Sequence, residues 1–89
     1  MLKPSYTNQF RRDLKLMGRR GKDPEKYKDV AKDLIAEKPL PDKLRNHKLA
    51  GAYRDRWECH LEPDWLLIYR LSGEEITFER TGTHSDLFE

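Results

Sequence analysis

The chain has 89 residues, of which 36% are hydrophobic and 38% charged, with a formal net charge of +2. A chain of this length buries roughly 60% of its unfolded surface, so residues 1–89 are expected to form a single domain whose functional site is a surface cleft. The single cysteine, Cys59, excludes an internal disulfide, and no apolar run approaches the length of a membrane span. There is no basic-then-apolar leader either. These features together predict a cytoplasmic protein without membrane contact.

The chain is predicted to begin with a short strand followed by a helix. A strand over residues 2–6 would contain Pro4, which lacks an amide hydrogen and therefore favours a sheet edge. The Thr7 hydroxyl can cap the segment that follows. Apolar residues recur there at helical spacing, at Phe10, Leu14 and Met17. The glycines at positions 18 and 21 end this helix.

A second helix is predicted to begin at Asp23-Pro24, where a capping side chain precedes a proline suited to the first helical position. Its apolar stripe follows the i, i+3, i+4, i+7, i+8 pattern at Tyr27, Val30, Ala31, Leu34 and Ile35. The stripe stops at Lys38-Pro39, because the residue before a proline is unfavourable in a helix. Such a stripe is expected to pack against the core.

The second half predicts an antiparallel meander over residues 53–61, 65–71 and 74–80, with turns at Glu62-Pro63-Asp64 and Ser72-Gly73. Tight turns would place Leu61 opposite Trp65, Cys59 opposite Leu67 and Phe78, and Trp57 opposite Tyr69 and Ile76. All these side chains are apolar or aromatic, and a one-residue slip would expose half of them. We therefore expect an α+β domain with two N-terminal helices packed on one face of a small antiparallel sheet. The other face would be basic and open.

This register gathers polar side chains at one rim of the sheet. His60 and Asp64 border the first turn, and the third strand returns Arg80 and His84 to the same end. Strict alternation would point Arg80 toward the core, opposite to His60, unless a bulge turns it. His47 precedes the meander, and the sequence alone does not place it.

The candidate site contains histidines, an aspartate and arginines, and the sequence has no phosphate-binding loop. This set of residues suits a reaction in which RNA is cleaved by its own 2′-hydroxyl. This reaction needs a base, an acid and cations, but no metal. Imidazole, with a pKa of about 6.5, can take either proton role, each typically contributing ~10²–10⁴ in rate. Arginine matches phosphate oxygens, which makes Arg54 and Arg56 on the open face candidates for substrate binding. The aromatics Trp65 and Phe88 can stack on bases, although Trp65 is expected to belong largely to the core.

A zinc site is disfavoured by geometry. Cys59 and His60 are adjacent on a strand and point to opposite faces, and no pair has finger-like ligand spacing. We expect neither a metal nor another cofactor.

Several segments of the second half together resemble the YafQ-type toxins of the RelE/ParE superfamily. They are the runs 47–51, 59–69 and 80–84, with Leu87-Phe88 at the end. The helical first half matches in length and layout only. Lys48 departs from the pattern, in which a proline or small residue is expected.

This resemblance implies a RelE-like fold and a bacterial type II toxin. Such a toxin is an endoribonuclease that enters the ribosomal A site, beside 16S rRNA, cuts translated mRNA, and is inhibited by an acidic cognate antitoxin. The residues at the family's catalytic positions are His47, His60, Asp64 and His84, and those that support catalysis or hold mRNA are Trp65, Arg80 and Phe88. We expect Asp64 or His60 to be the base and His84 the acid. His47 and Arg80 would stabilise the phosphate, and Phe88 would position a base.

Two other functions remain open from the sequence. A ParE-like member would share the fold and poison a DNA topoisomerase, but such proteins generally lack the set formed by His60, Asp64 and His84. A non-catalytic RNA-binding adaptor would keep a basic face but would not need histidines on a rim.

Overall fold

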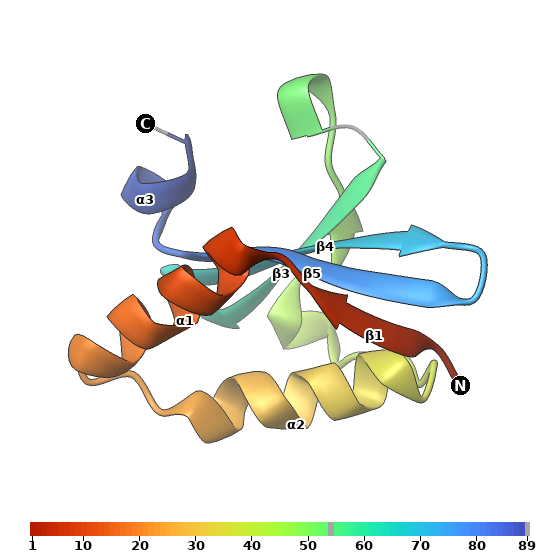
Figure 1. Cartoon of the computed structure of the whole chain (residues 1–89), viewed down its shortest axis with the longest axis horizontal. Coiled ribbons are helices and arrows are strands. Elements are labelled where there is room, and N and C mark those ends of the chain that lie inside the picture. The colour runs from red at the N-terminus through yellow and green to blue at the C-terminus, as the bar shows by residue number, and fades with distance from the viewer. Residues whose placement is uncertain (54, 89) are drawn as a thin grey trace.

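Five strands and three α-helices form the computed structural model of the chain, which describes residues 1–53 and 55–88 (Figure 1). The elements, with η for a 3₁₀ helix, are β1 (Lys3–Tyr6), α1 (Asn8–Arg19), α2 (Pro24–Ile35), η1 (Asp42–Leu44), β2 (His47–Lys48), η2 (Gly51–Tyr53), β3 (Arg56–Glu62), β4 (Trp65–Ser72), β5 (Glu75–Gly82) and α3 (His84–Phe88). The predicted α+β class is confirmed. No helix of the described residues is long and apolar enough to span a membrane.

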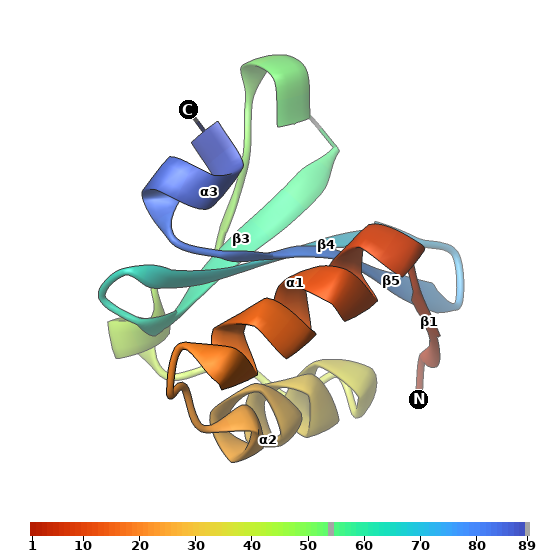
Figure 2. The same ribbon diagram turned by 60° about the vertical axis from the view of Figure 1, so that its left-hand side comes forward.

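The sheet has the order β1-β5-β4-β3-β2, and β1 runs parallel to β5 while the other pairs are antiparallel. The prediction of a purely antiparallel sheet is therefore wrong at this edge. No hairpin joins β1 to its neighbour, since α1 and α2 follow it and return the chain to the opposite edge (Figure 2). Pro4 lies on the edge strand, as predicted.

Both predicted helix starts are confirmed. The Thr7 hydroxyl accepts a hydrogen bond from the Phe10 amide at 2.9 Å, and the Asp23 carboxylate accepts one from the Glu25 amide at 3.0 Å. The second helix ends at Ile35, slightly before the predicted stop, because the chain turns through a left-handed conformation at Glu37 (φ 59°).

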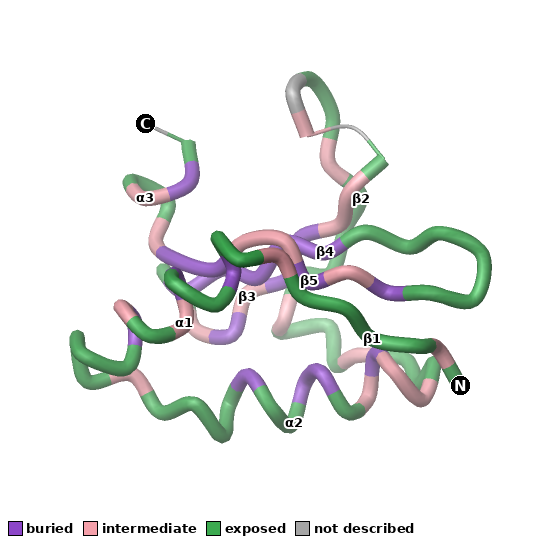
Figure 3. The backbone as a smooth tube through the Cα atoms, in the orientation of Figure 1, coloured by how far each residue is buried: buried purple, intermediate pink, exposed green. Residues whose placement is uncertain are grey.

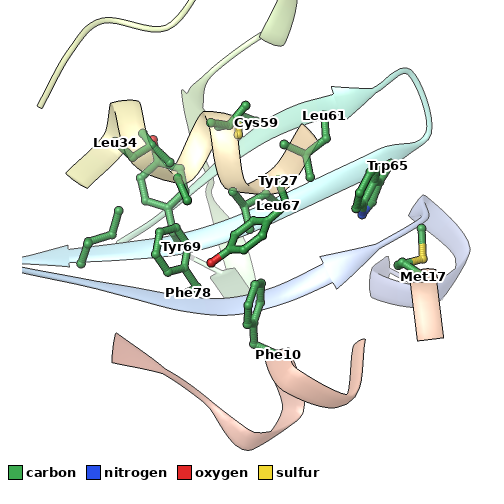
Figure 4. Packing of buried hydrophobic residues seen from close by; sticks show 13 residues of the cluster. Phe10, Met17, Tyr27, Leu34, Cys59, Leu61, Trp65, Leu67, Tyr69 and Phe78 are labelled. Carbon is green, nitrogen blue, oxygen red and sulfur yellow. The ribbon is translucent and has the colours of Figure 1, made fainter. Parts of the chain in front are cut away.

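The main core lies between the sheet and the helices α1 and α2. Buried residues occupy the central strands and recur along one side of α2 (Figure 3). Aromatic rings of α1, α2 and β5 meet at its centre, where Phe10, Tyr27 and Phe78 pack together (Figure 4). Cys59 is fully buried beside them, and burial raises the pKa of its thiol to about 12, so the thiol stays neutral.

A second, smaller core covers the opposite face of the sheet. Leu66 and Ile68 of β4 pack against Leu87 of α3, with Leu49 and Tyr53 at the periphery. The expectation that this face is simply basic and open is therefore wrong. The strand β4 is buried on both faces here, and α3 covers part of the surface that the sequence left open (Figure 2).

The predicted register holds between the first two meander strands but not between the last two. Trp57 pairs with Tyr69 and Cys59 with Leu67, as predicted. A bulge near the turn then pairs Glu62, instead of Leu61, with Trp65. On β5, Phe78 pairs with Tyr69 and Ile76 with Leu71, so each is displaced by two residues from its predicted partner. An even displacement keeps both side chains on the core face, which is why the predicted core survives.

Candidate active site

Three imidazole rings form a row across one face of the domain. The ring centroids of His47 and His60 lie 6.4 Å apart, and those of His60 and His84 lie 5.9 Å apart. They come from β2, β3 and the first residue of α3, respectively. The structure thus confirms the predicted convergence of His60 and His84 and adds His47, whose strand pairs with β3. Lys48 pairs with Trp57, so this strand forms with a lysine at that position.

Asp64 binds His84 through two hydrogen bonds. Its Oδ1 accepts from the His84 backbone amide at 2.9 Å and lies 2.8 Å from Nδ1 of the His84 ring. The hydrogen bond from the His84 backbone amide, and to a smaller extent the one from the His84 ring, hold the pKa of Asp64 below its usual value. Since an ionised carboxylate only accepts, Nδ1 carries the hydrogen and Nε2 is the atom available for proton transfer.

The start of α3 is fixed by a reciprocal cap. The Thr83 amide donates to the Asp86 carboxylate at 2.9 Å, and the Asp86 amide donates to the Thr83 hydroxyl at 3.2 Å. A Cβ at Gly82 would lie 3.0 Å from the Asp86 side chain, so glycine permits this close approach. Arg20, the residue that caps the end of α1, also binds Asp86 at 2.7 Å. This hydrogen bond, followed by the one from the Thr83 amide, lowers the pKa of Asp86 to about 2. The helix that carries His84 is thereby tied to the core helices.

Glu58 is a site residue that the sequence reasoning missed. Its side chain is only 6% exposed, and its Oε1 lies 3.3 Å from Nε2 of His60 and 3.6 Å from Nε2 of His47. The other ring nitrogen of His47 lies 2.6 Å from the Arg45 carbonyl. Glu58 and His60 are two residues apart on β3 and share one face, which was a usable signal. Glu58 therefore lies between two of the three imidazoles.

A bulge in β5 brings Arg80 to the same face as the histidines. Ile68 pairs with Arg80 but the next residue, Tyr69, pairs with Phe78, so Glu79 is the extra residue. Arg80 therefore points away from the main core, which answers the question that strict alternation left open. Its guanidinium is held by the buried Asp13 of α1, with Nε 2.7 Å from Oδ2. This hydrogen bond raises the pKa of Arg80.

Trp65 does not serve as a base-stacking residue in this structure. The side chain is 0% exposed and packs in the main core near Met17, and its ring nitrogen donates to the Thr81 hydroxyl at 2.8 Å (Figure 4). Neither face of its ring is exposed in this structure, which agrees with the expectation that Trp65 belongs largely to the core. Its aromatic ring and the family resemblance made it a candidate for substrate contact, and neither of these depends on its burial.

Phe88 lies beside His84 with part of its ring exposed, where it can meet a base as expected. It is 43% exposed, its ring centroid lies 6.3 Å from that of His84, and it contacts the Tyr53 ring edge-on. Arg56 is ion-paired with Glu79, so its charge is partly offset on the face where it was expected to bind substrate. Arg54, also predicted to bind substrate, lies outside the described residues.

Comparison with known proteins decides the family. Residues 2–89 match the family model described as the bacterial toxin of a type II toxin-antitoxin system, YafQ. The chain belongs to the YafQ family. It is 43% identical over 84 residues to the mRNA interferase toxin YafQ of Escherichia coli K12, a match that spans 93% of this chain and 91% of the relative. YafQ membership makes the chain a toxin of a type II system and separates it from the ParE-like alternative.

Solved YafQ-like structures share the whole fold. The chain superimposes with a TM-score of 0.93 and 40% identity on a chain of the E. coli DinJ-YafQ complex, with 100% of both chains covered. A metal-bound toxin from Helicobacter pylori gives a TM-score of 0.92 at 37% identity, covering 99% of this chain and 100% of that one. Within residues 1–53 and 55–88, no group of three or more His, Cys, Asp or Glu side chains has an arrangement that could hold a metal ion.

Proposed function

We propose that this chain is an mRNA interferase, an endoribonuclease that cuts translated mRNA in the ribosomal A site and acts in the cytoplasm. The observation that carries the proposal is the His84–Asp64 pair, which stands beside His60 and His47 on one face of the domain. The E. coli relative, which is an mRNA interferase toxin, supports the same activity. A non-catalytic adaptor would not need this constellation.

His84 is the general acid in the proposed reaction. The 2′-hydroxyl oxygen attacks the adjacent phosphorus while a base takes its proton, and the bond from phosphorus to the 5′-oxygen breaks. His84 gives its Nε2 proton to that departing oxygen, because Nδ1 is engaged with Asp64. The products are a 2′,3′-cyclic phosphate and a 5′-hydroxyl. Each proton role contributes ~10²–10⁴ to the rate.

His60 is favoured over Asp64 as the base. Asp64 already accepts two hydrogen bonds from His84 through Oδ1, and its lowered pKa makes it a weak proton acceptor. His60 becomes a cation when it takes the proton, and the buried Glu58 carboxylate, 3.3 Å from its Nε2, stabilises that cation. Asp64 acts instead by orienting His84, much as a carboxylate orients the histidine of a hydrolytic triad.

Negative charge on the phosphate is stabilised by His47 and Arg80. The guanidinium of Arg80 is held through Nε and one terminal nitrogen by Asp13, which leaves the other terminal nitrogen for a phosphate oxygen. Phe88, exposed beside His84, can stack on a neighbouring base and position it. No step of this reaction passes through a metal.

The partners of the toxin follow from the same proposal. An acidic cognate antitoxin would hold the chain inactive, and the DinJ-YafQ complex of E. coli supports a bound antitoxin in this family. The ribosome would be bound through 16S rRNA around the A site. The net charge of +2 is compatible with both acidic partners.

The experiment compares a defined mRNA during translation with the same mRNA free of ribosomes. We expect the mRNA to be cut only during translation, and toxin that was pretreated with a chelator should remain active. The upstream fragment should end in a 2′,3′-cyclic phosphate or a 3′-phosphate, and the downstream fragment should begin with a 5′-hydroxyl. A 5′-phosphate at the cut would mean that water is the nucleophile and would refute the histidine scheme. Equal cleavage of free mRNA would refute ribosome dependence.

A further inference from the structure

A cleft of about 440 Å³ shares His60 with the candidate active site. It opens between η1 and the turn that joins β3 to β4, which lie side by side (Figure 2). Lys26 of α2 contributes to its wall. The volume lies within the range of roughly 300–1,000 Å³ typical of small-molecule sites. No residue of the proposed mechanism other than His60 lines this cleft.

Cations dominate the charge of the cleft. Lys43 and Arg45 line it, and within residues 1–53 and 55–88 neither side chain has an ion-pair partner. The acid in the wall, Glu62, is neutralised by Lys22 at 2.7 Å and Lys26 at 2.9 Å. Two unpaired cations beside a neutralised carboxylate favour an anionic ligand.

Backbone carbonyls of the cleft contact two imidazoles of the active site. Arg45 has a left-handed conformation, with φ 49°, and its carbonyl lies 2.6 Å from Nδ1 of His47. His60 contacts the opposite wall, where its Nδ1 lies 3.4 Å from the Pro63 carbonyl. A ligand in the cleft would therefore lie next to two imidazoles of the proposed reaction.

Apolar side chains complete the lining. Leu44, Leu61 and Pro63 stand beside the cations. Apolar surface next to fixed positive charge suits a nucleotide, because its base can pack on the apolar surface while its phosphate binds the cations. A purely acidic peptide would use the cations but leave the apolar wall uncovered.

We propose that this cleft binds the mRNA nucleotide next to the scissile phosphate. Lys43 and Arg45 contact its phosphate, and its base packs against Leu44 and Pro63. The inference rests on the proposed function and adds a subsite at which the identity of a neighbouring base can affect cleavage.

The first test measures binding of a short single-stranded RNA with a 2′-deoxy substitution at the cleavage position, which prevents cutting. The double variant Lys43→Gln, Arg45→Gln is compared with Lys3→Gln, Lys15→Gln, which removes the same charge from exposed positions outside the cleft. The logarithm of the affinity is plotted against the logarithm of the salt concentration. We expect the slope of this plot to be smaller in magnitude by about 0.7 for the Lys43→Gln, Arg45→Gln variant, which corresponds to one lost phosphate contact. The control should keep the wild-type slope. Equal slopes in both variants would overturn the subsite.

The second test distinguishes mRNA from ribosomal RNA. A 4-thiouridine placed next to the cleavage position of ribosome-bound mRNA should crosslink to residues 43–45 of the wild type and not of the double variant. Crosslinks of the 4-thiouridine to 16S rRNA and not to residues 43–45, or equal crosslinking of the wild type and the double variant, would overturn the proposal. Wild-type cleavage of translated mRNA is measured in parallel, so that failure of the subsite is separated from failure of the enzymatic function.

Discussion

Replacing His84 with alanine should abolish most cleavage and leave the fold intact. The side chain is 56% exposed, so its loss leaves no cavity, and the backbone amide at this position can still donate to Asp64. The helix remains anchored by the Thr83–Asp86 cap and by Arg20. Unfolding free energy should therefore change by less than about 0.5 kcal/mol. Loss of the general acid should slow cleavage by ~10²–10⁴, or about 2.7–5.4 kcal/mol of transition-state stabilisation.

The assay is single-turnover cleavage of an mRNA on ribosomes, with thermal unfolding of the free toxin in parallel. Ser85→Ala is the matched control, because Ser85 is an exposed neighbour in the same helix. It should cleave like the wild type. If His84→Ala cleaves within tenfold of the wild type, or if Ser85→Ala is equally slow, another group supplies the proton and the assignment is wrong.

Three further outcomes are expected. Asp64→Asn should reduce cleavage less than His84→Ala does, because the asparagine amide oxygen can still accept from His84. The pH profile of cleavage should also shift, because the side chain at position 64 no longer carries a charge. A loss of cleavage as large as that of His84→Ala, with no shift in the pH profile, would make Asp64 the base. Cys59→Ser should cost roughly 1–3 kcal/mol in denaturant unfolding, because it buries a poorly paired hydroxyl, while the folded variant cleaves normally. The pKa of Asp86 is lowered from 3.8 to about 2, so its contact with Arg20 stabilises the fold above about pH 4 and that contribution is lost as the pH falls toward 2. The melting temperature of Asp86→Asn should depend less on pH between about pH 4 and pH 2 than that of the wild type. If the melting temperature of the wild type depends on pH as weakly as that of the variant, this ion pair does not have the proposed role.

Local signals explain how much of the fold the sequence predicted. Thr7 and Asp23-Pro24 cap their helices through contacts within three residues, so the chain's own order encodes them. The alternation of Trp57 and Cys59 with polar residues fixed the face of β3 that meets the helices. These features depend on periodicity and nearest neighbours. Distant pairing was not needed to find them.

Contacts between distant segments explain what the sequence did not predict. The parallel pairing of β1 with β5 and the second core under Leu87 join parts of the chain that no local pattern relates. Trp65 is a candidate for substrate contact because it is aromatic and matches a family position, yet its indole is enclosed by the core. Asp13 acts through Arg80, which another element brings to it, so its importance appears only in the folded chain. Glu58 shares β3 with His60, and the alternation of that strand was a signal that could have found it.

The bulge at Glu79 sets which side of β5 each residue faces. Phe78 faces the helices and Arg80 faces the histidines, although a regular strand in which Glu79 also paired would put both on one side. A change that paired Glu79 with β4 and removed the bulge would therefore turn Arg80 toward the apolar interior. Deletion of Glu79 would instead make Phe78 and Arg80 consecutive residues of a regular strand, so they would still face opposite sides and the Thr81 hydroxyl would stay beside the Trp65 nitrogen that it binds. The position of Arg80 thus depends on Glu79 remaining outside the pairing with β4.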